Sequence, residues 1–295
     1  METIILDTQF YDKGVTASYL IESSDGLILI ETGPDSTYSN ILNSLSEHGY
    51  TLRDVRHVFV THIHLDHSGA AWHFAKEGSN IYVHPKGAPH LINPERLVAS
   101  ATMIYKDKME ELWGRVEGIA EDKVFSLNDG EETKIGEVTI TAFETLGHAS
   151  HHHAYLVEDS LFTGDIGGMR ARNGPVIPPT PPPDINLELW YESIEKINKI
   201  NPKMIYPTHF GGYEDVGSHL NYLAEYLDKL SDCVGQLIKE DKNEEEITAG
   251  YKEYYQSLFG STDSDIITFD CYEAADPHWM NLGGLTRYWR KFRLS

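Results

Sequence analysis

The chain has 295 residues, 40% of them hydrophobic, which is enough apolar material for one large core with a smaller unit attached. Its 24 basic and 46 acidic residues give a formal charge of −22, which disfavours nucleic acid and anionic membranes as partners. No stretch approaches the roughly 20 apolar residues that span a bilayer, no secretory leader is visible, and two cysteines are too few for a disulfide framework. These totals predict a cytoplasmic protein that acts on a small molecule.

The first half of the chain alternates strand-like runs with helical segments. Apolar and β-branched runs bounded by turn residues predict strands at residues 3–8, 17–23, 26–33, 55–62 and 80–85. Helices are predicted at 39–47 and 68–78. Residues 91–121 also look helical, and we expect this long insertion to overhang a cleft. The alternation predicts an α/β fold, in which the loops that follow strands hold the functional residues.

Strand patterns return between residues 124 and 162, including a hairpin with a central glycine at 133–146. The segment 173–184 contains six prolines and is therefore stiff and extended. We expect it to form a rigid wall of the cleft; a plain spacer and a ligand for a proline-binding module are the alternatives. A helix capped by Asp184 or Asn186 follows it, and a last short strand is predicted within 201–212.

The C-terminal part of the sequence has a different character. Apolar residues from Leu220 to Leu237 repeat at steps of three and four, which gives an apolar seam along one helix. We expect the seam to pack against its own domain or against a second helix at 244–258, and a homodimer through these helices is the alternative. The chain is therefore predicted to divide into a catalytic domain at 1–215 and a helical extension with a basic, aromatic tail at 216–295.

The sharpest motif is THIHLDH, at residues 61–67, directly after an apolar strand. His62 and His64 are two positions apart in an extended loop and can converge on one metal ion. Asp66 and His67 point elsewhere, which indicates a second metal beside the first. Imidazole nitrogens and carboxylate oxygens suit Zn, Fe or Mn better than Ca or Mg. Because two adjacent cations need more ligands than this loop supplies, later loops must contribute the rest.

Three later segments complete the pattern: GHAS at 147–150, FTGD at 162–165 and PTHFGG at 207–212. Together with HxHxDH, in this order and in loops after strands, they resemble the metallo-β-lactamase superfamily over roughly residues 15–215. The resemblance implies a four-layer αββα fold, here with the C-terminal helical extension added. It also implies a metal-dependent hydrolase.

The resemblance implies a role for each of the seven residues. His62, His64 and His148 would hold one divalent metal ion, Zn, Fe or Mn. A second ion would be held by Asp66, His67 and His209. Asp165 would bridge the two. The remaining histidines of the run 151–153 are predicted to start a strand or to support the ligands, with His152 the nearest to the metals. Ordinary polar roles are predicted for the others: His57, His73, His84, His90, His219 and His278.

Two adjacent cations can lower the pKa of a water towards 7 and stabilise an oxyanion, so the resemblance predicts hydrolysis. Asp66 is the candidate catalytic residue, because a ligand carboxylate can orient the water or pass a proton to the leaving group. The full ligand set resembles glyoxalase II thioesterases and acyl-homoserine lactonases, which predicts a thioester or lactone substrate. Arg170 and Arg172 are candidates to bind an anionic substrate group, and Tyr213 to donate a hydrogen bond; solvated arginines and a packed tyrosine are the alternatives.

Four other functions remain open at this stage. Persulfide dioxygenases share HxHxDH and use a single iron, which His62, His148 and Asp165 would hold. A phosphodiesterase or nuclease of the same fold is disfavoured by the charge of −22. β-Lactam hydrolysis is disfavoured because dedicated lactamases act outside the cytoplasm. A protein that binds metal without catalysis is the least favoured, because the ligand pattern is complete.

Overall fold

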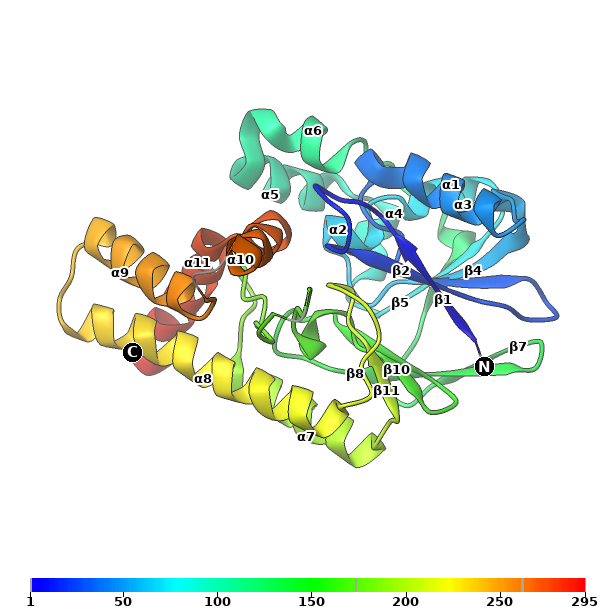
Figure 1. Cartoon of the computed structure of the whole chain (residues 1–295). Coiled ribbons are helices and arrows are strands. Elements are labelled where there is room, and N and C mark those ends of the chain that lie inside the picture. The colour runs from blue at the N-terminus through cyan, green and yellow to red at the C-terminus, as the bar shows by residue number, and fades with distance from the viewer. Residues whose placement is uncertain (1, 173, 261–262, 295) are drawn as a thin grey trace.

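The computed structural model describes residues 2–172, 174–260 and 263–294, and it has two β-sheets packed face to face (Figure 1). The first sheet has six strands in the order β1-β2-β3-β4-β5-β6. Its antiparallel half contains β1 (Thr3–Asp7), β2 (Ala17–Ile21) and β3 (Leu27–Ile30). Its parallel half adds β4 (Val55–Phe59), β5 (Asn80–Val83) and β6 (Val124–Ser126).

The second sheet has five strands in the order β11-β10-β9-β8-β7. The strands β7 (Glu132–Ile135), β8 (Val138–Glu144), β9 (His153–Val157) and β10 (Ser160–Phe162) form an antiparallel meander. The last strand, β11 (Met204–Tyr206), pairs parallel to β10. The hairpin predicted at 133–146 is β7 and β8, with Gly136 in the turn at a φ of +58°.

Aromatic and branched side chains fill the space between the sheets. Tyr19 and Phe59 of the first sheet are fully buried against Tyr155 and Phe162 of the second. Each sheet presents alternate residues to this interface and the others to an outer face, as the period of two in a strand requires. Both outer faces are themselves apolar and need helices to cover them.

Helices cover both outer faces and complete the predicted αββα arrangement. The first sheet is covered by α1 (Tyr38–Glu47), α3 (Ala71–Lys76) and α4 (Ala88–Ile92). The second is covered by α7 (Leu187–Ile200) and α8 (Val216–Lys239). Asn186 is the cap of α7, its side chain accepting a hydrogen bond of 3.0 Å from the Leu189 amide. The four-layer α/β fold predicted from the sequence is confirmed.

Two helical units lie outside the four layers. The predicted insertion forms α5 (Glu95–Tyr105) and α6 (Met109–Trp113). The C-terminal extension continues from α8 into α9 (Glu244–Ser257), α10 (Asp263–Ala275) and α11 (His278–Tyr288). Figure 1 shows α10 and α11 on the same side of the two sheets as α5. None of the described helices is long and apolar enough to cross a membrane.

The apolar seam of α8 packs inside the same chain. Leu220, Leu223, Leu227 and Leu230 are almost completely buried, in one cluster with Trp190 of α7. The first of the two interpretations of the seam therefore holds. A homodimer through other faces of these helices stays a prediction, as does the boundary at residue 215, because the same cluster runs across it.

Candidate metal centre

The predicted ligands lie where strands end, at one edge of the two-sheet core. β4 is a buried parallel strand, and the chain leaves it through the loop that contains His62 and His64. His64 is the cap residue of the short helix α2 (Leu65–Ser68), which begins with Asp66 and His67 in its first turn. The two sheets are joined at this edge by a backbone hydrogen bond of 2.8 Å from His153 to Thr61.

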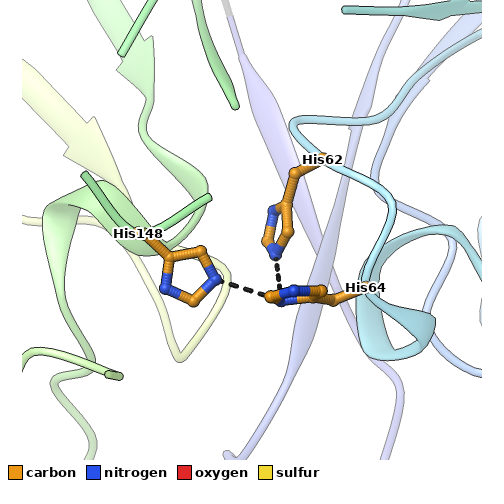
Figure 2. A group of neighbouring side chains, drawn as sticks. All are labelled: His62, His64 and His148. Carbon is orange, nitrogen blue, oxygen red and sulfur yellow. Dashed lines mark hydrogen bonds between the residues drawn. The ribbon is translucent and has the colours of Figure 1, made fainter. Parts of the chain in front are cut away.

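The first group consists of three imidazoles. Figure 2 shows His62, His64 and His148 pointing toward one another, the first two from the loop after β4 and the third from the loop after β8. His64 Nδ1 lies 2.9 Å from His62 Nε2 and 3.1 Å from His148 Nε2. Burial, followed by the neighbouring imidazoles, lowers the pKa of His62 well below its usual value. The same causes lower the pKa of His64 to about 4, so both rings are neutral at pH 7, as metal ligands must be.

The second group lies next to the first. Asp66 Oδ2 is 3.6 Å from His67 Nε2 and 3.4 Å from His209 Nε2, and these three side chains could hold a cation between them. His209 comes from the loop after β11. Burial raises the pKa of Asp66, but His67 and His209 outweigh it and bring that pKa to about 2. The carboxylate is therefore ionised at neutral pH.

Asp165 lies between the two groups and faces both. It sits in a 3-10 turn, Gly164–Gly167, directly after β10. Its Oδ2 is 3.4 Å from His148 Nε2 and 3.9 Å from His62 Nε2, whereas its Oδ1 is 3.2 Å from His67 Nε2 and 3.6 Å from His209 Nε2. One oxygen thus points to each group, which is the arrangement a bridging carboxylate needs.

Two buried polar atoms of this cluster lack hydrogen bonds. His67 Nε2 and Asp165 Oδ1 have no hydrogen-bond partner within the described part of the chain, although both are shielded from water. Orphaned buried polar atoms are costly, and a lone pair on each is available to a cation. Imidazole nitrogens and carboxylate oxygens that lie within 4.8 Å of one another fit divalent metal ions of the zinc, iron or manganese type.

Backbone and side-chain acceptors fix which nitrogen each ring presents. His148 Nδ1 donates to the Pro179 carbonyl at 2.9 Å, and His209 Nδ1 is 3.3 Å from the Val15 carbonyl. His67 Nδ1 is 3.1 Å from a carboxylate oxygen of Glu31. In each case Nδ1 is directed to an acceptor and Nε2 is turned towards Asp165, where it could bind a cation.

Glu31 organises the cluster from behind, and the sequence analysis missed it. It directly follows β3, is 1% exposed and has a φ of +64°. Its carboxylate accepts hydrogen bonds from the Thr61 hydroxyl and amide and from the Thr208 hydroxyl, besides that from His67. It therefore connects the loops that hold His62, His67 and His209. An acidic residue that ends the buried strand LILI was the only local signal for it.

The histidine run has three different environments. His152 Nδ1 lies 2.9 Å from the Thr145 hydroxyl, and its Nε2 accepts a hydrogen bond of 3.3 Å from the Asp165 amide, so it supports a predicted ligand. Its ring is 4.9 Å from that of His62, nearer than the 6.2 Å of His151. His151 faces the cleft, and His153 begins β9. The positions of His152 and His153 agree with the roles predicted for them, whereas His151 lines the cleft instead.

A cleft of about 360 Å³ opens onto the metal cluster. One wall comes from α5 and its flanks, including Leu97, Ala101 and Ile104. The opposite wall comes from the proline-rich segment, including Pro179 and Pro181 to Pro183, and from the junction of α10 with α11. The predictions of an overhanging insertion and a proline wall are both correct. The contribution of the C-terminal extension to this cleft was not anticipated.

The three residues predicted to bind substrate are not among those that line this cleft. Arg170 pairs with Asp215 at 2.9 Å and lies over the ring of Tyr213. Tyr213 donates its hydroxyl to the backbone carbonyls of Arg170 and Phe210. Arg172 pairs with Asp12 at 2.8 Å. The three side chains are therefore engaged by partners outside the cleft, and proximity to Asp165 in the sequence was misleading here.

Most of the other histidines have ordinary structural partners, as predicted. His73 lies 2.6 Å from an Asp35 oxygen, and His84 lies 2.9 Å from a Glu144 oxygen. His219 Nε2 donates to the Gly167 carbonyl at 2.8 Å. His90 differs, because it lines the cleft.

Comparison with known proteins agrees with this geometry. The family model of the metallo-β-lactamase superfamily matches residues 11–209, and the chain belongs to that superfamily and is a metallohydrolase. The chain is 29% identical over 177 residues to the metallo-β-lactamase fold-containing protein ST1585 of Sulfurisphaera tokodaii, covering 59% of this chain and 67% of that protein. The crystal structure of ST1585 superposes with a TM-score of 0.69 at 23% identity and covers 96% of this chain and 97% of that one.

Two curated relatives have catalytic names. An atrochrysone carboxyl ACP thioesterase of Aspergillus fumigatus is 22% identical over 243 residues, which cover 82% of this chain and 48% of the relative. A hydroxyacylglutathione hydrolase of Dictyostelium discoideum is 28% identical over 162 residues, which cover 51% of this chain and 48% of the relative. The chain thus spans about half the length of each of these two proteins.

Proposed function

We propose that this protein hydrolyses an acyl bond, a thioester or a lactone, at a pair of divalent metal ions. The observation that carries the proposal is the division of seven side chains into two groups that share one carboxylate, Asp165. His62, His64 and His148 would hold one ion, and Asp66, His67 and His209 the other. Two cations held there would supply a water of lowered pKa and a Lewis acid for a carbonyl oxygen.

The residues of the chain would orient and protonate the reacting groups. Both Asp66 and Asp165 line the cleft, but the side chain of Asp66 is 15% exposed and that of Asp165 only 4%. Asp66 is therefore the carboxylate better placed to receive a proton from the water and to deliver it to a leaving group. The walls of α5 and the proline-rich segment would exclude bulk water from the substrate.

The choice of an acyl bond is supported by the names of the two relatives, one an ACP thioesterase and the other a hydroxyacylglutathione hydrolase. The largely apolar cleft walls suit an acyl group better than a polyanionic nucleic acid. The complete second group, with His209, favours two ions over the single iron of a dioxygenase.

The test is a substrate panel with metal analysis. The protein would be loaded separately with Zn, Fe and Mn, and the metal-to-chain ratio measured by elemental analysis. Each form would then be assayed on thioesters, lactones, a phosphodiester and glutathione persulfide, with an oxygen electrode for the last. We expect two ions per chain and turnover of a thioester or lactone. Oxygen consumption with one iron per chain would contradict the proposal and indicate a dioxygenase. Turnover of the phosphodiester alone would contradict it and indicate a phosphodiesterase.

A further inference from the structure

Two polar side chains of the cleft take no part in holding the proposed metals. Asp276 follows α10 and lines the cleft from the C-terminal extension, and Tyr105 ends α5 on the opposite wall. Most of the surrounding wall residues are apolar, among them Ala101, Pro277 and Met280. In a mainly apolar pocket, a few polar groups usually fix the orientation of the bound substrate.

The position of Asp276 is fixed by a hydrogen-bond chain that leads back to the metal cluster. Asn281 on α11 donates from Nδ2 to Asp276 Oδ2 at 2.6 Å. The same side chain accepts from the Thr180 hydroxyl at 2.9 Å, through Oδ1. Thr180 follows Pro179, whose carbonyl accepts from His148. These hydrogen bonds fix the position of Asp276 relative to His148, a predicted metal ligand from a different part of the chain.

Both groups have unused hydrogen-bonding capacity. Asp276 is 7% exposed, and in the described part of the chain the bond from Asn281 is the only hydrogen bond to its carboxyl group, which has room for several. The Tyr105 hydroxyl has no hydrogen-bond partner among the described residues; its ring packs against that of Trp113 at 4.9 Å. Burial, with added repulsion from Asp66 and Asp276, raises the pKa of Tyr105, so the phenol keeps its proton.

We infer that Asp276 and Tyr105 together bind a hydroxyl group carried on the acyl part of the substrate, away from the bond that is cleaved. A hydroxyl both donates and accepts, so it can donate to the Asp276 carboxyl while it accepts from the Tyr105 phenol. An unsubstituted chain would leave both protein groups desolvated and unpaired, which disfavours its binding. The inference rests on the proposed acyl-bond function, because it defines which acyl groups that site accepts.

The test uses binding of product acids, which needs no turnover. Decanoic acid and a series of monohydroxydecanoic acids, with the hydroxyl moved stepwise along the chain, would be titrated into zinc-loaded protein by calorimetry. We expect at least one hydroxy acid to bind about ten-fold more tightly than decanoic acid. Tyr105→Phe, which removes one oxygen atom, should lower this preference several-fold, and Asp276→Leu should abolish it.

A matched control separates this pair from general effects of charge. Asp184→Asn alters another carboxylate of the same cleft, one already engaged by the Ser150 hydroxyl at 2.5 Å, and should keep the preference. No preference in the native protein, or equal loss in Asp184→Asn, overturns the inference. If Asp276→Leu does not fold, an unchanged preference in Tyr105→Phe is sufficient to overturn it. Turnover of thioesters and lactones is measured separately, so the proposed function can fail or stand independently.

Discussion

The rim of predicted metal ligands and the walls of the cleft are built in opposite ways. The ligands come from loops directly after β4, β8, β10 and β11, and hydrogen bonds that they donate to Glu31, to His152 and to a backbone carbonyl fix their orientation. The walls come from an insertion, a proline-rich segment and the junction of the last two α-helices, and many of the side chains that they present to the cleft are apolar. The rigid strands position the predicted metal ligands, whereas the added segments determine the shape of the cleft above them.

This difference separates reaction type from substrate choice. Changes at the rim should remove metal and turnover together. Changes in the walls should alter stability or substrate affinity and leave the metal content unchanged. The following experiments test that separation.

Asp165→Ala should have the largest effect. Asp165 faces both groups, so its loss leaves the two sites without their shared anion. We expect fewer than two metal ions per chain and a fall in kcat/KM of about 1,000-fold or more. Elemental analysis and steady-state kinetics would measure both. Asp159→Asn, on a surface carboxylate paired with Lys203 at 2.6 Å, is the control. A metal-replete and active Asp165→Ala protein would contradict a bridging role.

Leu227→Ala should reduce stability without affecting the rim. Leu227 is completely buried in the cluster that α8 shares with α7, α9 and α11. Removing its side-chain carbons should lower the free energy of unfolding by about 2–5 kcal/mol, measured by urea denaturation. Tyr222→Ala, on the same helix at a residue that is 52% exposed, should change it by less than about 0.5 kcal/mol. Metal loss from folded Leu227→Ala protein would show that the extension does more than support the wall.

Glu31→Gln tests whether the rim depends on the residue behind it. The amide keeps the shape but removes the charge that holds His67 Nδ1–H and the Thr61 hydroxyl. Supporting residues of this kind typically contribute 10- to 100-fold to metal affinity, and we expect a loss of about that size. Competition with a chelator measures it. Glu137→Gln, at an exposed carboxylate bonded to Ser24, should bind metal normally.

His219→Gln tests the connection between the two regions, because His219 on α8 donates to Gly167 beside Asp165. Burial lowers the pKa of His219 to about 4. In the unfolded chain the pKa of His219 is about 6.5, so between about pH 6.5 and pH 4 this histidine is protonated in the unfolded chain but neutral in the folded chain. The free energy of unfolding therefore falls as the pH falls towards 4. The variant lacks this loss. Relative to the variant, the native protein should lose about 2 kcal/mol between pH 7 and pH 5, measured by urea unfolding.

The contrast between rim and walls also explains what the sequence could reveal. All seven predicted ligands lie together because each follows a strand, and strand ends can be recognised from short apolar runs. The proline wall was predictable because proline fixes its own backbone conformation. These features are local, so a single sequence contains them.

The features that were missed depend on contacts between distant segments. Asn281 bonds to Thr180, 101 residues earlier, and no motif marks either residue. Arg170 and Arg172 were misplaced because their partners Asp215 and Asp12 lie 45 and 160 residues away in the sequence. Glu31 had only a weak local signal, because one buried acid at a strand end does not identify its partners.

Ile104→Ala should have the smallest effect and tests the wall most directly. Ile104 lines the cleft yet is 39% exposed, so truncation removes apolar contact with substrate and leaves the core intact. Loss of the contacts of a few methyl and methylene groups should raise KM for an apolar acyl substrate by about three-fold, with kcat and metal content unchanged. The neighbouring Met103→Ala is the matched control, because Met103 is 73% exposed on the same helix and does not line the cleft. A fall in kcat with unchanged KM would place Ile104 among the groups that act on the reacting atoms, and the separation between rim and wall would not hold at that position.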